Sequence, residues 1–359
     1  MAHLKIHIDR IIDNIEKISA LMTAYHKQWS LVVKVLGTDK MVFEKILNHP
    51  AVIDTHSIAV SQWKSLKMVK QINPLLRTMF IKPPAIPNAA NIVRYADISL
   101  NSSLATIQAL SKEAVKQNKI HQVLVMIEMG ELREGIHREG LIPFYKRVFQ
   151  LPNIDVIGIG TNLGCMHGIK PTYDKLIQLV LYEQLIEAKF QKNLPLISGA
   201  SSITIPMLEK GKVPAGINHF RIGEAVFLGT SPLNNKQVMD LNTGAFTFEA
   251  NIVELYKKGS QPDGAVTEGA VGHIATDNDF SEQQSYKAIL DFGELEVDPT
   301  NLIPENPSVS YVGNSSDLTV YNLGDNLQNY KTGDLIRFRL KYMAVAKIMY
   351  SRFVDKVLV

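Results

Sequence analysis

A lysine lies inside the first strongly apolar run of the sequence. Lys34 stands within the segment LVVKV, residues 31–35, where a strand buried on both faces should not accept a charge. Burial disfavours the ammonium form, and the neutral amine that results is the form that makes Schiff bases. A lysine at such a position can equally extend its amine to solvent or pair with a carboxylate. Composition alone leaves both interpretations open.

Two segments rich in small residues follow later apolar runs. SGASS occupies residues 198–202 and RIGEA occupies residues 221–225. Small residues let backbone N–H groups approach an anion, most readily where a helix begins. In a closed α/β barrel, a phosphate commonly lies after the seventh and eighth strands. Ordinary Gly/Ser turns give similar sequences, so phosphate binding and turn chemistry both remain open here.

Two arginines are candidates for binding anions or a cofactor. Arg133 belongs to the charged, glycine-containing segment EMGELREG, residues 128–135, and its guanidinium could hold a carboxylate by two hydrogen bonds. A loop of this composition is otherwise simply solvated. Arg221 stands at the end of an apolar run, where an unpaired charge would be costly. We therefore expect Arg221 to contact a carboxylate or a cofactor atom.

Nucleophilic and metal chemistry have weaker support. Cys165 and His167 lie two residues apart in the loop segment GTNLGCMHG, residues 160–168, and this spacing gives no geometric reason for a nucleophile–base pair. The histidines show no metal-ligand spacing, and we predict no catalytic metal. Those considered are His3, His7, His56, His121, His137, His219 and His273.

The elements that must position these residues form a regular pattern up to about residue 225. Short apolar runs, typical of strands buried on both faces, alternate with amphipathic helical segments. The pattern predicts an eight-stranded α/β barrel, a (β/α)8 TIM barrel, with a doubly wound open sheet as the alternative. The runs are LVVKV (31–35), SIAV (57–60), TMFI (78–81), ADISL (96–100), VLVMI (123–127), VIGIG (156–160), PLIS (195–198) and HFRI (219–222).

The pattern changes near residue 235. Alternating segments separated by turn clusters predict a mostly antiparallel β domain. We therefore expect two domains, an α/β barrel over residues 1–235 and a β domain over residues 236–359. The predicted strands lie within 246–256, 285–292, 308–313, 318–323 and 334–342.

Composition limits the partners and the location. The 359 residues carry 38 Lys+Arg against 35 Asp+Glu, a net charge of +3, and no basic footprint for nucleic acid is evident. One cysteine excludes an intrachain disulfide or a Cys-rich zinc site. No apolar run is long enough for a membrane helix, and the N-terminal segment lacks the features of a signal peptide. We expect a cytoplasmic globular protein that binds neither nucleic acid nor membranes.

Seven motifs in order resemble one family. The sequence is similar to the alanine racemase-like, fold-type III pyridoxal-phosphate enzymes, and most similar to the ornithine racemase branch of the alanine/ornithine racemase family. The motifs cover nearly the whole chain with consistent spacing. They are VVKVLGTD (32–39), EMGELREGI (128–136), GIGTNLGC (158–165), SGASS (198–202), INHFRIGEAVFLG (217–229), GNSSD (313–317) and RFRLKY (337–342).

The resemblance assigns roles to residues around the cofactor. It implies that Lys34 is the Schiff-base lysine and the base on one face of the substrate α-carbon, and that Arg221 faces the pyridine nitrogen. It also implies that Arg133 lies near the phenolic oxygen and the substrate carboxylate. The residues that would hold the phosphate are Ser201, Gly223 and Glu224, the last two through their backbone, with Ser202 an equally plausible hydroxyl and Tyr350 a looser match.

The sequence also departs from alanine racemases. Thr38 stands where they have a tyrosine, and Asn162 stands where they place a histidine against the cofactor ring, as in the ornithine-type branch. Their second base is a tyrosine, whereas the closest stretch here has Glu268. We hypothesise that Glu268 is the opposite-face acid/base with a raised pKa. Asp317 matches an active-site aspartate and could recognise a cationic substrate side chain.

The function implied is pyridoxal-phosphate-dependent racemisation of an amino acid, with two bases and a homodimer in which the active sites are shared. Ornithine, lysine, alanine or a broad set of substrates all remain open. A decarboxylase or aldolase on the same fold is one alternative. A non-catalytic pyridoxal-phosphate carrier and a phosphate-binding barrel without this cofactor are the others.

Overall fold

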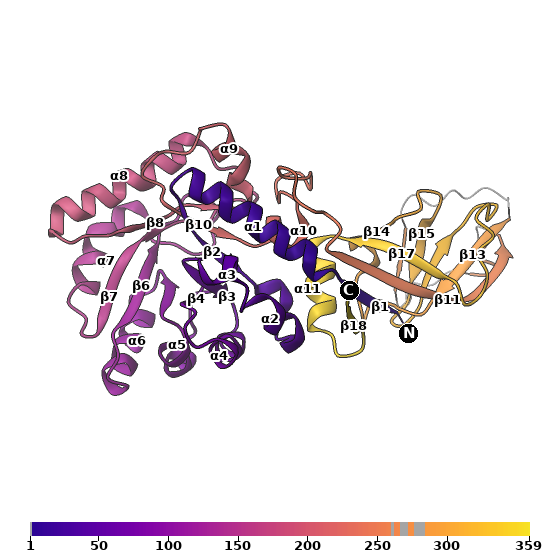
Figure 1. The fold of residues 1–359 in the computed structure, drawn as a ribbon, viewed down its shortest axis with the longest axis horizontal. Coiled ribbons are helices and arrows are strands. Elements are labelled where there is room, and N and C mark those ends of the chain that lie inside the picture. Colours follow the sequence, from indigo (N-terminus) through magenta and orange to yellow (C-terminus); the bar gives the residue numbers. More distant parts are fainter. Residues whose placement is uncertain (1, 260–261, 266–271, 276–283) are drawn as a thin grey trace. The chain divides into compact units, whose positions relative to one another are not determined.

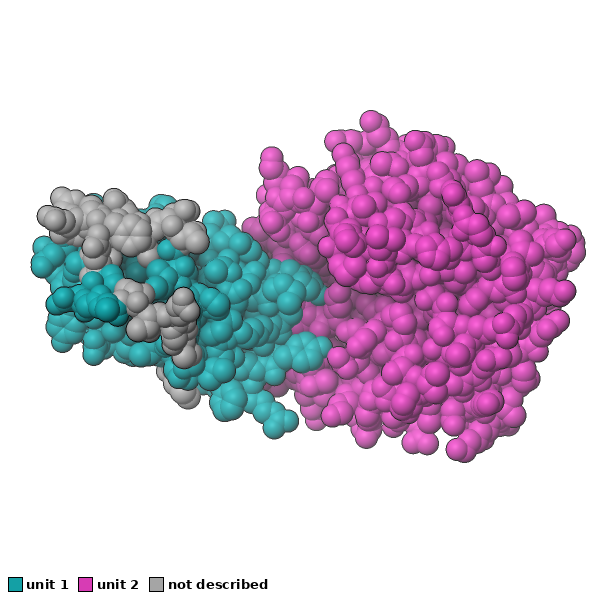
Figure 2. Space-filling view, turned by 180° about the vertical axis from the view of Figure 1, so that it is seen from behind, with its two compact units in different colours: residues 1–10, 244–359 teal, residues 11–243 magenta. Residues whose placement is uncertain are grey.

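The computed structural model describes residues 2–259, 262–265, 272–275 and 284–359. The chain divides into two compact units, residues 11–243 and residues 1–10 with 244–359 (Figure 2). The sequence pattern had left the first ten residues with the barrel. They lie instead with the C-terminal unit, because strand β1 (His3–Ile6) pairs with strands of that unit.

The first unit, described over its whole length, is built on a parallel sheet. Its strands coincide closely with the apolar runs, because continuous apolar sequence suits strands covered on both faces. The strands are β2 (Gln28–Val32), β3 (Ser57–Val60), β4 (Thr78–Phe80), β5 (Ile98–Asn101), β6 (His121–Met126), β7 (Ile154–Gly160), β8 (Leu196–Ser198), β9 (Ala200–Ser201) and β10 (His219–Ile222).

The parallel sheet closes on itself. Its strand order runs from β8 through β7 down to β2 and then to β10 and β9. Gly199 alone separates β8, which pairs with β7, from β9, which pairs with β10. The two short strands are therefore consecutive parts of one barrel strand. Counted in this way, the sheet is an eight-stranded barrel. The predicted (β/α)8 barrel is confirmed, and the open doubly wound sheet is not found.

Helices follow the strands and cover the outside of the barrel (Figure 1). Several begin at a side chain that accepts a hydrogen bond from the first turn, such as Thr172 before α8 and Ser103 before α6. The helices are α1 (Ile8–Ala24), α2 (Lys40–Ile46), α3 (Pro50–Ile53), α4 (Trp63–Ile72), α5 (Ala89–Tyr95), α6 (Leu104–Lys116), α7 (Leu141–Val148), α8 (Tyr173–Phe190), α9 (Ile205–Glu209) and α10 (Glu224–Leu228).

The barrel interior is partly apolar and partly polar. A strand turns alternate side chains to one face, so Ser30 shares the inward face of β2 with Val32, and Ser198 shares that of β8 with Leu196. The inward apolar cluster consists of Val32, Ala59, Met79, Ile98, Leu100, Leu124, Met126, Ile157 and Leu196.

The C-terminal unit is a mostly antiparallel sheet, as expected. Strand β1 pairs antiparallel with β11 and parallel with β18. The remaining pairs are antiparallel, and α11 (Tyr342–Tyr350) follows β17. The strands are β11 (Phe246–Lys258), β12 (His273–Ile274), β13 (Ser285–Leu290), β14 (Leu302–Pro304), β15 (Ser310–Asn314), β16 (Thr319–Asn322), β17 (Leu335–Leu340) and β18 (Asp355–Leu358). Among the described helices, none is both long and apolar enough to cross a membrane.

Candidate active site

The chemically useful side chains gather at one end of the barrel. Lys34 follows β2, Arg133 lies in the loop after β6, and Cys165 lies in the loop after β7. Glu224 begins α10, separated by one residue from the end of β10. The carboxyl ends of parallel strands meet at one rim of a barrel, and enzymes built on an α/β barrel have their active sites at that rim. The charges that act on the Lys34 amine come from Cys165, Arg133, Glu224 and Glu134. The structure thus brings these residues into one site.

Lys34 lies just beyond its strand and not within it. Strand β2 ends at Val32, and Lys34 opens a short 3-10 turn that continues to Leu36. The expectation that residues 31–35 form one strand is therefore wrong at its end, because Val33 adopts φ −91° and ψ 15°, outside the extended region. The side chain of Lys34 remains exposed at the rim. Desolvation by the surrounding protein nevertheless lowers the pKa of its amine.

The loop after β6 has a defined internal structure. Ile127 and Ile136 form a bridge at its base, and the Glu128 carboxylate accepts hydrogen bonds from the N–H groups of Gly130 and Arg133. Gly135 has φ +139°, and a Cβ there would lie 2.2 Å from the backbone nitrogen of Glu128. The glycine is therefore required by the close approach of the two ends of the loop.

Arg133 is held by two neighbours that the sequence did not reveal. Its guanidinium binds both carboxylate oxygens of Glu134, through Nε and, at 2.5 Å, through Nη2. Its Nη1 atom donates to Cys165 Sγ at 2.6 Å. The ion pair with Glu134 raises the pKa of Arg133, so the group stays cationic. Sequence reasoning treated Cys165 only as a poor partner for His167, and nothing in the spacing indicated its contact with Arg133.

A buried carboxylate shapes the neighbouring loop. Glu131 is 2% exposed and accepts hydrogen bonds from the backbone N–H groups of Cys165, His167 and Ile169, at 3.1, 3.0 and 2.8 Å. Burial opposes ionisation of Glu131, but these hydrogen bonds hold its pKa below the usual value. Glu131 therefore ties the loop after β7 to the loop after β6. The only signal for this contact in the sequence was a carboxylate in one glycine-containing segment, with a second glycine-containing segment after the next strand.

Arg221 lies inside the barrel and is 8% exposed. Its Nη1 atom donates to the carbonyl oxygen of Ser198 at 2.7 Å and to the Ser198 hydroxyl, and its Nη2 atom donates to the carbonyl oxygen of Thr161 at 2.7 Å. Burial lowers the pKa of Arg221 to about 10, so the guanidinium remains charged at neutral pH. These acceptors are neutral oxygens, so the carboxylate that was one of the two expected partners is not among the hydrogen-bond partners of Arg221 in the described chain.

The two serines of the SGASS segment differ in their environment. The Ser202 hydroxyl accepts hydrogen bonds from the N–H groups of Gly223 and Ala225, at 3.3 and 3.2 Å, and Ser202 is buried. Ser201 is half-buried and pairs with Arg221 across the sheet. Burial raises the pKa of the Glu224 carboxyl to about 7, against the opposing effect of Lys34. The Ser202 hydroxyl thus engages the N–H group of Gly223, which the resemblance assigned to phosphate.

Asn162 provides an independent test of whether a ligand fits this end of the barrel. Its Nδ2 atom is buried and has no hydrogen-bond partner among the described residues. A buried donor without a partner costs free energy that a bound acceptor would recover. Asn162 follows β7 at the same rim as Lys34 and Arg133. This donor, together with the cations, suits an anionic cofactor that carries hydrogen-bond acceptors.

Two of the remaining predicted residues belong to the C-terminal unit, and the third lies outside the described residues. Asp317 lies on an exposed turn of the C-terminal unit, where Ser316 Oγ donates to its carboxylate at 2.5 Å. Tyr350 ends α11 and is 51% exposed. Glu268 lies outside the described residues. Among the described residues, no group of three or more His, Cys, Asp or Glu side chains could hold a metal ion.

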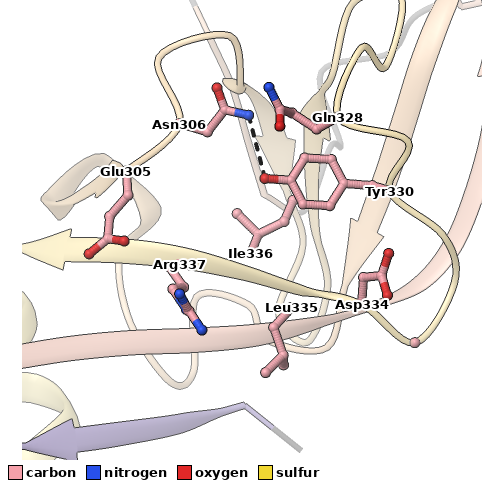
Figure 3. Close-up of a pocket in the computed structure, with 9 residues that line it drawn as sticks. Glu305, Asn306, Gln328, Tyr330, Asp334, Leu335, Ile336 and Arg337 are labelled. Atoms are coloured by element: carbon pink, nitrogen blue, oxygen red, sulfur yellow. Dashed lines mark hydrogen bonds between the residues drawn. The ribbon is translucent and has the colours of Figure 1, made fainter.

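The C-terminal unit has a hollow of its own, of about 770 Å³, on the surface formed by β17 and adjoining loops. Figure 3 shows polar side chains around it, with the Asn306 amide donating to the Tyr330 hydroxyl. None of the candidate catalytic or binding residues named from the sequence lines this hollow. Its lining is Glu305, Asn306, Gln328, Tyr330, Gly333, Asp334, Leu335, Ile336 and Arg337.

Comparison with known proteins identifies the family. A family model described as alanine racemase, N-terminal domain, matches residues 6–231, which is most of the chain. An ornithine racemase of Acetoanaerobium sticklandii is 32% identical over 354 residues, 98% of each chain. The chain belongs to the alanine racemase family. A lysine racemase of Thermotoga maritima is also similar, at 31% identity over 78% of this chain and 77% of the relative. The family and the racemase class expected from the sequence are confirmed.

Solved alanine racemases share the fold over the full length. The enzyme of Pseudomonas aeruginosa superimposes with a TM-score of 0.74 at 15% identity, covering 100% of both chains. That of Bartonella henselae, described with covalently bound pyridoxal phosphate, gives 0.73 at 14% identity and covers 100% of this chain and 99% of its own. At these identities the likeness establishes the barrel and the β domain.

Proposed function

We propose that this protein is a pyridoxal-phosphate-dependent amino-acid racemase that acts on ornithine or lysine, or on a broader set including them. The observation that carries the proposal is the 32% identity to an ornithine racemase over 98% of both chains. The similarity to a lysine racemase points to the same kind of side chain. Both names refer to amino acids with a second, cationic amine.

The residues at the barrel rim suit pyridoxal phosphate. When bound, this cofactor draws electrons from the substrate α-carbon and so makes the α-proton removable. Lys34 would hold the cofactor, Arg221 would face its ring nitrogen, and the unpartnered Nδ2 of Asn162 would donate to it. Ser201 and the backbone of Gly223 and Glu224 would hold the phosphate, which would take the Gly223 N–H from the Ser202 hydroxyl.

Lys34 would move the proton on one face of the substrate α-carbon. A base must be neutral to accept a proton, and desolvation lowers the pKa of the Lys34 amine toward that state. The exposed position of Lys34 beyond β2 lets its amine reach a substrate at the rim. On this proposal, Glu268 returns the proton on the opposite face.

The two arginines would have separate tasks. Arg133 would orient the substrate carboxylate with the N–H groups that Glu134 and Cys165 leave available. The Arg221 guanidinium stays charged inside the barrel, and a fixed cation opposite the ring nitrogen disfavours protonation of that nitrogen. With the ring nitrogen unprotonated, return of the proton to the substrate α-carbon would be favoured over side reactions.

The β domain would complete the site and set specificity. Asp317 would attract the distal amine of an ornithine-like or lysine-like substrate, and Tyr350 would reach the phosphate. Residues of that domain would act on the active site of a partner subunit, so the working protein would be a homodimer. We also propose a cytoplasmic location. These assignments rest on the family resemblance and on the residues present.

The visible absorbance of the purified protein tests the proposal. We expect a yellow protein whose band is reduced by borohydride to a stable adduct on Lys34, identified by peptide mass spectrometry. Lys34→Ala should give no adduct and should not racemise. The loss of optical rotation should then be measured with L-ornithine, L-lysine and L-alanine. A colourless protein that cannot be reconstituted with pyridoxal phosphate would overturn the assignment, as would a Lys34→Ala variant of full activity.

A further inference from the structure

A continuous set of buried hydrogen bonds runs from Arg221 through the interior of the barrel to Ser57. Arg221 Nη1 donates to Ser198 Oγ, and the same hydroxyl lies 2.7 Å from Nδ1 of His219. The other ring nitrogen of His219, Nε2, lies 2.9 Å from Ser30 Oγ, which in turn lies 2.7 Å from Ser57 Oγ. His219, Ser30 and Ser198 are fully buried.

The same set reaches the opposite end of the barrel. Ser57 Oγ lies 3.3 Å from Nδ1 of His56, and Nε2 of His56 accepts a hydrogen bond from Arg77 Nη1 at 2.9 Å. Arg77 precedes β4 and His56 precedes β3, so both stand at the amino-terminal ends of their strands. The rings of His56 and His219 also contact edge to face, with centroids 4.8 Å apart.

The number of hydrogen-bond donors and acceptors in this set of side chains determines the charge of His219. Both ends are arginines, which only donate. Every hydroxyl and every neutral imidazole between them supplies one proton, so one serine hydroxyl must accept twice. A protonated His219 would add a further donor with no acceptor, inside a site that water does not reach. Burial accordingly lowers the pKa of His219 well below its usual value. The ring therefore stays neutral, with one nitrogen donating and the other accepting.

His219 does not touch the rim at which the reaction would occur. It begins β10, two residues before Arg221 on the same inward face, and it meets Arg221 through the Ser198 hydroxyl. We propose that His219 is a positioning residue that, through Ser198, fixes the Arg221 guanidinium against the cofactor ring. The inference rests on the proposed function, because it requires that Arg221 face that ring.

Loss of His219 would act on Arg221 through a defined sequence of contacts. Without its ring, Ser198 Oγ loses one of its two partners and can rotate away from Nη1. A hydrogen bond to a charged group contributes about 1.5–3 kcal/mol, which corresponds to a factor of roughly 10–100 in an equilibrium constant. The guanidinium would then sample positions from which it no longer blocks protonation of the ring nitrogen.

Three substitutions at one position separate positioning from packing. In His219→Asn the amide lies near the place of Nδ1 and can bond Ser198, whereas in His219→Gln it reaches toward Ser30. His219→Leu can do neither. A matched control exists in the same barrel, since buried His121 bonds Ser99 through Nε2 at 2.7 Å without contact to Arg221. The control substitution is His121→Leu.

Two quantities are measured on each full-length protein. The first is the affinity of the cofactor-free protein for pyridoxal phosphate, by visible absorbance titration. The second is how often, per racemisation, the substrate amino group passes to the cofactor to give pyridoxamine phosphate and the corresponding keto acid. We expect His219→Leu and His219→Gln to lower the affinity about tenfold or more and to raise this side reaction to a similar extent. His219→Asn should recover most of both quantities.

The outcomes distinguish this inference from the proposed function. Wild-type protein that neither binds pyridoxal phosphate nor racemises would overturn the proposed function. Wild-type protein that does both, with His219→Leu equal to His121→Leu in both quantities, would overturn the role of His219 alone. If His219→Leu does not fold, the comparison of His219→Asn with His219→Gln decides. Equal behaviour of those two variants would also contradict the proposal.

Discussion

Nη1 of Arg133 donates a hydrogen bond to Sγ of Cys165 over 2.6 Å. The two residues belong to loops that follow neighbouring strands, β6 and β7, and the contact crosses the rim of the barrel beside Lys34. Glu131 reinforces it by holding the backbone N–H of Cys165. The arginine that we propose orients the substrate carboxylate thus depends on a thiol for part of its own orientation.

The thiol contact gives the first prediction. Alkylation of Cys165 with iodoacetamide should lower racemase activity about tenfold or more, because the added group displaces Arg133 from the substrate carboxylate. Cys165 is the single cysteine of the chain, so mass spectrometry gives its modification directly. Bound pyridoxal phosphate should slow the alkylation. Cys165→Ser, whose hydroxyl can still accept from Arg133, should remain active and resist the reagent, and full activity after complete alkylation would disprove the contact's importance.

Gly135 provides a second prediction. Gly135→Ala would place Cβ 2.2 Å from Glu128 N at φ +139°, so the loop must open and Arg133 must move. We expect KM for the amino acid to rise about tenfold or more, with a smaller effect on kcat. Gly140→Ala is the matched control, because a Cβ there meets only Ile136 Cγ2, at 3.4 Å. Steady-state kinetics on both variants decide, and equal KM values would contradict the prediction.

The half-buried carboxyl of Glu224 should make stability depend on pH. Burial raises its pKa from 4.5 to about 7, so the folded state favours the protonated form. Below about pH 4.5 the group is protonated in both states and costs nothing; above about pH 7 it is ionised in both, and the folded state bears the cost. Glu224→Gln should therefore stabilise the cofactor-free protein by about 1–3 kcal/mol at about pH 8.

Urea unfolding at several pH values measures this difference. The advantage of Glu224→Gln should shrink as the pH falls from about 7 and vanish near pH 4. An advantage that is constant over this range would show that packing, and not ionisation of the carboxyl, is responsible.

The proposed second base is tested by Glu268→Gln. We expect racemisation to fall about 10²–10⁴-fold, the usual contribution of general acid–base catalysis, while pyridoxal phosphate still binds. Exchange of the substrate α-proton with solvent deuterium should persist from the isomer whose proton faces Lys34, because that base remains. Nuclear magnetic resonance of both enantiomers in heavy water measures this asymmetry, and unchanged racemisation would remove Glu268 from the mechanism.

The barrel was predictable because each of its strands corresponds to a short, continuous apolar run in the sequence. Periodicity indicated the strands, but their closure required the pairing of β8 and β9 on either side of Gly199. The end of β2 was misplaced because Val35 and Leu36 are apolar and buried, although they belong to a turn. Hydrophobicity reports burial, and a buried turn resembles a strand in sequence.

The cationic residues of the site could be identified from the sequence, whereas the residues that contact them could not. Lys34, Arg133 and Arg221 stood out because charges at apolar strand ends require an explanation. Glu134 and Ser198 are common residue types in unremarkable positions, and only the folded chain reveals their contacts with Arg133 and Arg221. Glu134 directly follows Arg133 and Ser198 lies 23 residues from Arg221, so neither a short nor a long spacing indicated the contact.

Strand β1 precedes the other described elements along the chain, yet one of its partners, β18, follows them all. It lies between β11 and β18, and β18 covers residues 355–358. Residues 11–243 can therefore acquire their structure before β18 is synthesised, whereas β1 cannot complete its pairing until then. The C-terminal sheet cannot be completed until residues 355–358 have been synthesised. Fusions or deletions at the first residues should accordingly damage the C-terminal unit and leave the barrel largely intact.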